Sequence, residues 1–153
     1  MARRQVLGFI FSVNAILSFQ SAHAQDKTQQ CEFYRETAEV LHCPADNYLM
    51  KHGYKYCRRF AEMNDQFRPQ TQVTLQYLRS CLIQALDDRA DLTCENVEGI
   101  AIESHFECYQ KSDFCQLTRP EKLKIFWVIK SLLKDPNYRQ LFVQVQAMCR
   151  HQN

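Results

Sequence analysis

Eight cysteines constrain the fold of this chain of 153 residues more than any other feature of its sequence. The stretch Glu103–Cys115, ESHFECYQKSDFC, ends one amphipathic segment and begins another. Intervals of 23, 12, 13, 6 and 33 residues separate six successive cysteines, which are Cys57, Cys81, Cys94, Cys108, Cys115 and Cys149. The pattern predicts a set of helices that are held together by their sulfur atoms.

Residues 1–24 have the pattern of a secretory signal peptide. Arg3 and Arg4 give a positive start, the run 6–19 is mostly apolar, and Ala22-His23-Ala24 is a small-x-small cleavage site. A retained membrane anchor is the weaker interpretation, because a spanning helix needs about 20 apolar residues. We expect cleavage after Ala24, a secreted extracellular protein that begins at Gln25, and one helical domain over residues 25–153.

All eight cysteines lie after residue 24, so export would place them in an oxidising compartment. An even number of cysteines there indicates disulfides, but the spacing does not choose among the many connectivities. A zinc site is the competing use of clustered cysteines, yet the sequence has no C-x2-C or H-x3-H pair. We expect four bridges within the chain, hence a monomer or a non-covalent dimer, and no metal site.

The charge balance argues against nucleic acid as a partner. Removal of Arg3 and Arg4 with the signal peptide reduces 19 Lys and Arg residues to 17, which equals the 17 Asp and Glu residues. A chain without net charge has no strong field to attract nucleic acid or an anionic membrane surface. No second long apolar run follows residue 24, so we also expect no membrane span.

Composition and periodicity together predict a compact all-α domain of about five to six helices. Only Gly53 and Gly99 follow residue 24, and the chain has 4 prolines, too few turn residues for a β-sandwich or barrel. Leu123 and Trp127 belong to the apolar stripe of the fifth expected helix. Apolar residues recur at three- and four-residue steps over about 31–41, 46–60, 69–86, 96–110, 118–133 and 135–149.

Several polar residues mark where these helices should begin. We expect Asp46 to cap the second helix, which bends near Gly53. Thr118 and Glu121 have the spacing of a capping box, in which hydroxyl and carboxylate satisfy backbone N–H groups reciprocally. Asp135 precedes a proline and should cap the last helix.

The sequence lacks the motifs of common secreted enzymes. It has no G-x-S-x-G, no H-E-x-x-H, and neither the calcium loop nor the Cys-Cys-x-x-His-Asp helix of phospholipases A2. Glu103, Ser104 and His105 are adjacent, and neighbours on a helix point in different directions, so they cannot form a triad. The acidic run Asp87–Asp91 lacks the spacing of an EF-hand loop. We predict no enzyme, no catalytic residue and no cofactor; the sequence identifies no binding residue.

The cysteine series resembles that of the stanniocalcin family over about residues 31–149. Its anchors are GYKYCRRFAEMNDQFRPQTQVTLQYLRSCL and IAIESHFECYQKSDFCQL, whose intervals of 23, 13 and 6 residues match those of the family. Outside the cysteines, the shared residues are few: Phe60, Phe67, Gln70, Ser80, Glu107 and Tyr109. The family's extra N-terminal cysteine pair, glycosylation site, dimer-linking cysteine and long C-terminal tail have no counterpart in this sequence.

The resemblance implies a disulfide pairing and a function. The implied pairs are Cys31–Cys57, Cys43–Cys94, Cys81–Cys108 and Cys115–Cys149. Stanniocalcins are secreted, hormone-like proteins linked to calcium and phosphate balance, and some inhibit pappalysin metalloproteinases. The resemblance therefore implies a signalling or inhibitory protein that binds an extracellular partner, either a receptor or a protease.

Two other functions stay open at this point. A secreted helical carrier of a small apolar ligand is favoured if the aromatic-rich stripes leave a cavity instead of closing on each other. A small secreted hydrolase is the third alternative, because paired carboxylates carry no local signature. It would require a cleft with two carboxylates of raised pKa.

Overall fold

The computed structural model describes residues 28–151, and over this range the chain is all-α, as the sequence predicts. Six α-helices are joined by short π and 3-10 turns, and this part of the chain has no strand. None of the helices between residues 28 and 151 combines the length and apolar character that crossing a membrane requires. The predicted signal peptide and its cleavage after Ala24 lie outside the described residues.

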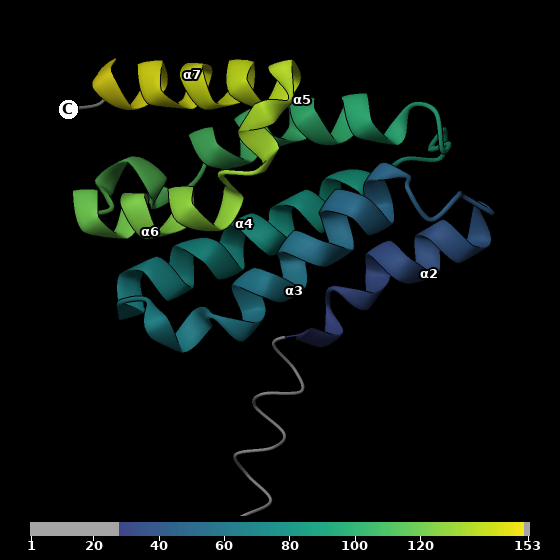
Figure 1. Cartoon of the computed structure of the whole chain (residues 1–153), viewed down its shortest axis with the longest axis horizontal. Helices are drawn as coiled ribbons and strands as arrows, with labels where there is room; N and C mark the ends of the chain where they lie inside the picture. The colour runs from purple at the N-terminus through teal and green to yellow at the C-terminus, as the bar shows by residue number, and fades with distance from the viewer. Residues whose placement is uncertain (1–27, 152–153) are drawn as a thin grey trace, which may run out of the picture.

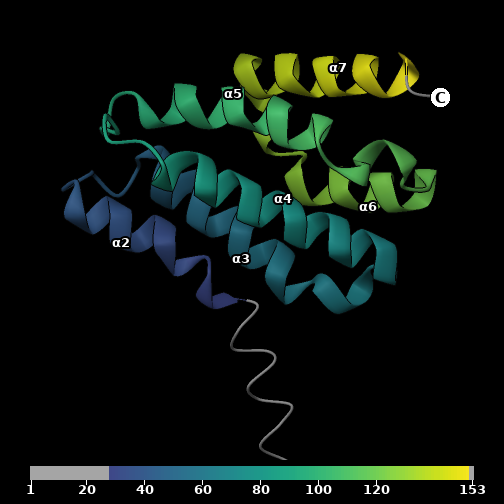
Figure 2. The ribbon, with the colours of Figure 1, turned by 180° about the vertical axis from the view of Figure 1, so that it is seen from behind.

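The helices are stacked in layers (Figure 1). One layer holds α2 (Glu32–Val40), α3 (Lys55–Glu62) and α4 (Pro69–Asp87) side by side. Above α4 lies α5 (Val97–Gln110), and α7 (Pro136–His151) packs on the far side of α5. The short α6 (Arg119–Ile129) contacts α3 and lies beside one end of α4, and the view from behind shows the same order (Figure 2).

The end of α2 is set by a residue in the left-handed conformation. His42 has φ of 56°, the only positive φ at a residue other than glycine over residues 28–151. The amides of His42 and Cys43 donate to the carbonyls of Glu39 and Ala38, at 3.2 and 2.9 Å, which is the Schellman pattern. This turn reverses the chain and presents Cys43 to Cys94.

The second predicted helix is continuous but wider than expected in its first half. A π-helix, η2 (Leu49–Tyr54), runs directly into α3. Gly53 is required there for space, because a Cβ would overlap the Tyr34 ring of α2, lying 2.6 Å from its Cε1 atom. The predicted cap at Asp46 is wrong, since the side chain of Asn47 accepts the Leu49 amide at 3.1 Å.

The predicted capping box at α6 is also wrong. Thr118 makes no side-chain cap, and Glu121 is buried, with its carboxylate accepting from the Arg68 amide at 3.0 Å and from Lys124 at 2.8 Å. Burial tends to raise the pKa of Glu121, but these hydrogen bonds and one from Thr71 hold the pKa below its ordinary value. The carboxylate thus stabilises the start of α4, where the helix dipole favours a negative charge.

Two further helix predictions have different outcomes. The predicted cap of α7 is confirmed, because Asp135 accepts the Asn137 amide at 2.8 Å. The predicted inward stripe of α6 is wrong for Leu123 and Trp127, which are each 55% exposed. The buried side of α6 is formed by Ile125 and Val128 together with Glu121. Because Glu121 is charged, the periodicity of apolar residues in the sequence does not identify this side as the buried one.

The buried apolar side chains form two clusters instead of one continuous core. The first lies between α4, α6 and α7 and contains Leu75, Leu78, Phe114, Ile125, Leu141 and Val145 among others. The second lies between α2, η2 and the start of α5 and contains Tyr34, Tyr48, Leu49, Leu86, Val97 and Tyr138 among others. The division of the core is the feature of the fold that matters most for a binding site.

Four disulfides join the helices, and no cysteine between residues 28 and 151 is free. They are Cys31–Cys57, Cys43–Cys94, Cys81–Cys108 and Cys115–Cys149, the same four pairs that the family resemblance implied. Cys81–Cys108 joins α4 to α5, with Cα atoms 5.9 Å apart. Cys108 is 1% exposed and belongs to the first cluster, so this bridge fixes two long helices face to face.

Replacing this bridge by alanine should therefore destabilise the domain. We expect Cys81→Ala combined with Cys108→Ala to lower the free energy of unfolding by roughly 2–5 kcal/mol, because the unfolded chain loses a constraint and a buried contact is removed. Urea unfolding under oxidising conditions measures the change. Peptide mapping of the unreduced wild-type protein is the control, and a fragment that joins Cys81 to a cysteine other than Cys108 would contradict the structure.

Candidate functional site

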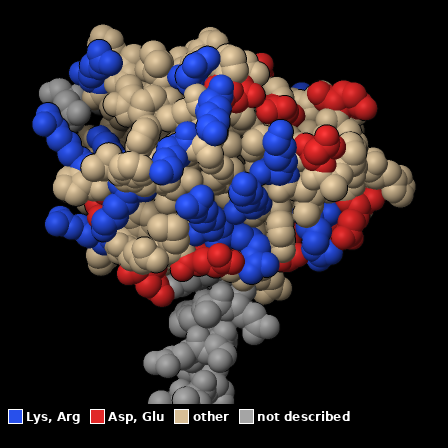
Figure 3. Space-filling view, in the orientation of Figure 1, with Lys and Arg blue, Asp and Glu red and all other residues tan. Residues whose placement is uncertain are grey.

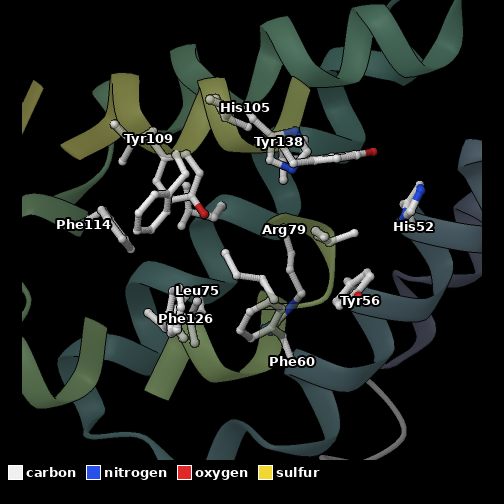
Figure 4. A pocket seen from close by; sticks show the side chains of 18 of the residues that line it. His52, Tyr56, Phe60, Leu75, Arg79, His105, Tyr109, Phe114, Phe126 and Tyr138 are labelled. Atoms are coloured by element: carbon white, nitrogen blue, oxygen red, sulfur yellow. The ribbon is translucent and has the colours of Figure 1, made fainter. Parts of the chain in front are cut away.

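A cavity of about 480 Å³ lies where the two apolar clusters meet. Its walls come from η2, α3, α4, α5, α6 and α7. In Figure 4 the labelled side chains of α5 and α7 lie at the top, those of η2 and the start of α3 at the right, and Phe126 of α6 at the lower left. The lining takes Leu75, Leu78, Phe114, Ile125, Leu141 and Val145 from the first cluster, and Tyr34, Tyr48, Cys57 and Tyr138 from the second. Small-molecule sites in proteins have this size, concave shape and mostly apolar wall.

The charged side chains of the lining are all positive. Arg79, Arg119 and Lys122 line the cavity, whereas none of the Asp and Glu side chains of residues 28–151 does. Arg119 and Leu123 are exposed, so they mark the edge at which the cavity reaches the surface. Lys122 lies deeper; its Nζ donates to the Cys115 carbonyl at 2.6 Å, and burial lowers its pKa. The two carboxylates that a hydrolase would require are absent from this lining.

Arg79 is the most unusual residue of the site. It projects from α4 among the lining residues, close to the middle of the group that Figure 4 labels. The residue is only 7% exposed, and its Nε and Nη1 atoms are buried without a hydrogen-bond partner. Burial lowers the pKa of the guanidinium, although not enough to deprotonate it, because arginine stays charged in proteins.

Two histidines line the same cavity. His105 Nδ1 lies 2.6 Å from the Ala101 carbonyl oxygen, which can only accept, so Nδ1 carries the proton. His52 stacks on Tyr56 with ring centroids 6.4 Å apart, and its Nδ1 is buried without a partner. Burial lowers the pKa of both rings, so that both are uncharged at neutral pH.

The hydroxyl groups of two lining tyrosines form hydrogen bonds with residues outside the cavity. Tyr56 shares a hydrogen bond of 2.7 Å with Ser131, and Tyr138 donates to Glu98 at 3.2 Å; neither partner lines the cavity. Their rings therefore contribute apolar surface while their hydroxyls stay satisfied. Burial raises the pKa of Tyr109 to about 12, so this lining residue is also un-ionised at neutral pH.

Sequence reasoning missed the cavity and its polar residues, although one signal was present. Leu75, Leu78, Leu82 and Leu86 form the inward stripe of α4, and Arg79 falls at a core-facing position of that stripe. A charged residue on an apolar helix face is the pattern that could have identified it. Whether the helices closed on one another or left a space was not accessible from the sequence.

The other residues considered for chemistry are engaged elsewhere. Ser104 donates to the Ile100 carbonyl at 2.8 Å and His105 to Ala101, so the two do not contact each other as a nucleophile and a base would. In the acidic run Asp87–Asp91, Arg89 pairs with Asp91 at 2.9 Å. Over residues 28–151 there is no group of three or more His, Cys, Asp or Glu side chains with the arrangement of a metal site.

No known protein family, curated protein or solved structure matches this chain.

The partly buried histidines His52 and His105 should make the stability of the protein depend on pH. The pKa of His105 is lower in the folded state than its ordinary value of 6.5, so the unfolded chain binds the proton first as the pH falls below that value. Stability is therefore full above about pH 7 and decreases as the pH falls towards 5. His105→Gln should flatten part of this decrease, leaving the contribution of His52.

Urea unfolding at several pH values measures the effect. His151→Gln is the matched control, because His151 is exposed at the end of α7 and should leave the pH profile as in wild type. A His105→Gln profile with the same slope as wild type between pH 7 and 5 would show that folding does not lower the pKa of His105.

Proposed function

We propose that this protein is an extracellular binding protein that carries a small apolar ligand in the cavity. The observation that carries the proposal is a cavity of about 480 Å³ with a largely aliphatic and aromatic wall, in a domain of modest size. Four disulfides support an extracellular location, because such bridges persist in oxidising compartments.

The size of the cavity argues against a simple packing defect. The cavity opens at the surface beside Arg119 and Leu123, and its volume of about 480 Å³ falls within the roughly 300–1,000 Å³ of small-molecule sites. A fold that retains such a space gains free energy from an occupant that replaces the missing contacts. An apolar molecule provides these contacts better than water, which requires polar partners.

Ligand binding can be tested with an uncharged, polarity-sensitive dye and its displacement by hydrocarbon-chain molecules. We expect one dye per protein, with a dissociation constant on the order of micromolar. Val145→Phe places extra atoms in the cavity from the buried face of α7 and should weaken dye binding about tenfold or more, because the added ring occupies the ligand's space.

The matched control for this variant is Val143→Phe on the same helix. Val143 is 61% exposed and does not line the cavity, so this change should leave binding unaltered. Circular dichroism verifies that both variants keep the helical fold. If wild-type protein neither binds nor releases the dye at micromolar concentration, the carrier function is wrong.

A second candidate is the protein-binding role of the family that the cysteine series resembles. The observation that favours it is the connectivity of the four bridges, which agrees with the stanniocalcin pairing. As a stanniocalcin-like signalling or inhibitory protein, the chain would bind a receptor or a metalloproteinase through its surface. The exposed side chains of Leu123 and Trp127 on α6 would form the apolar centre of such a surface. Lys130 lies beside them, with its Nζ 4.3 Å from the centroid of the Trp127 ring.

This candidate predicts inhibition of a pappalysin metalloproteinase by the oxidised protein. Trp127→Ala should weaken the inhibition about tenfold or more, since truncation of an interface tryptophan removes a large buried contact. Tyr77→Ala is the control, because Tyr77 is an aromatic side chain that is 42% exposed on another helix. Full proteolysis in the presence of excess wild-type protein would exclude the inhibitory function.

A further inference from the structure

We propose that the ligand of the cavity is an amphiphile with one carboxylate group, of the fatty-acid class, and that Arg79 binds that carboxylate. The inference rests on the carrier function proposed above and names the chemical class of the ligand. It follows from the position, the burial and the missing partner of a single guanidinium.

Within residues 28–151, no hydrogen bond or ion pair accounts for the burial of the Arg79 guanidinium. Its Nε and Nη1 atoms are enclosed and unbonded, and no aspartate or glutamate among residues 28–151 lies within salt-bridge distance of it. The side chain is 7% exposed, so bulk water does not solvate the charge freely. A buried charge in this state is strongly unfavourable unless another group pairs with it.

The position of Arg79 in the sequence also favours a ligand-binding role over a structural one. Arg79 lies in the leucine stripe of α4, beside Leu75, Leu78 and Leu82, where an apolar side chain would stabilise the fold more than a charge does. A guanidinium at such a position, facing a cavity, is well suited to hold an anion. Its planar fork donates several hydrogen bonds to one carboxylate, and exclusion of water strengthens each of them.

The surrounding wall limits the rest of the ligand. Apolar side chains of α6 and α7, including Phe126, Ile129, Leu141 and Phe142, provide contacts for a hydrocarbon chain. No acidic side chain of the described residues lines the cavity to repel the headgroup. Of the three cations that line the cavity, Arg119 is exposed at its edge and Lys122 already donates to the Cys115 carbonyl, so Arg79 is the buried one without a partner. One such guanidinium balances one negative charge, which fits a carboxylate better than the nearly double charge of a phosphate monoester.

The test compares three ligands that share one hydrocarbon chain: laurate, lauryl alcohol and lauryl phosphate. Each displaces the uncharged dye from the oxidised full-length protein at pH 7. Wild type should bind laurate about ten- to a hundredfold more tightly than lauryl alcohol, the range expected of a charge-assisted hydrogen bond. It should also bind laurate more tightly than lauryl phosphate.

Variants then assign the preference to the guanidinium. Arg79→Met should bind laurate and the alcohol within about twofold of each other, with the alcohol bound as tightly as by wild type. Arg139→Met is the control, because Arg139 is exposed on α7 and does not line the cavity, and it should keep the wild-type preference. Ligand-free Arg79→Met should melt at or above the wild-type temperature, since it removes an unpaired buried charge.

Each result has a defined consequence. Equal binding of laurate and the alcohol by wild type would overturn the role of Arg79 and leave the carrier function intact, and tighter binding of lauryl phosphate would overturn the carboxylate class. Binding of none of the three would overturn both proposals. If Arg79→Met melts below wild type but keeps the laurate preference, Arg79 is structural and the inference fails; if it does not fold, Arg79→Gln replaces it.

Discussion

The domain depends on four covalent links between helices that do not share one core. The bridges close loops of 26, 51, 27 and 34 residues, and in the chain-entropy model each contributes about 3–4 kcal/mol by restricting the unfolded chain. Covalent constraint therefore permits a divided core that apolar packing alone would not hold open.

The same bridges fix the walls of the cavity before any ligand arrives. Cys57, itself a lining residue, is bonded to the start of α2, and Cys81–Cys108 holds α4 against α5. Cys115–Cys149 ties the turn before α6 to α7, which forms the opposite wall. A preformed site of this kind loses little conformational entropy on binding.

One face of the molecule is uneven in charge. In Figure 3, Lys and Arg side chains cover the left and middle of this face, and most acidic side chains lie to the right and at the lower edge.

Much of this fold was predictable, because its determinants are local. The cysteine spacing, the few glycines and the apolar periodicity predict helices that agree with the structure to within a few residues, except that the fifth ends at Ile129, and Asp135 caps α7 as expected. The errors arise where a distant residue replaces a local partner. Glu121 accepts a hydrogen bond from the Arg68 amide instead of capping its own helix. Because this charged residue is on the buried side of α6, apolar periodicity wrongly predicted that Leu123 and Trp127 face the core. The cavity was not predictable, since the meeting of two apolar stripes depends on the positions of helices distant in sequence.

The central claim is that an anionic amphiphile occupies the space between the two clusters, with its charge at Arg79. A crystal structure of the oxidised protein grown with laurate tests this most directly. The account predicts continuous electron density for one hydrocarbon chain between α3 and α4 on one side and α6 and α7 on the other, with the carboxylate within hydrogen-bond distance of the Arg79 guanidinium. A structure in which Leu78, Phe126 and Val145 close on one another, or in which Arg79 pairs with a carboxylate of the protein, would contradict it.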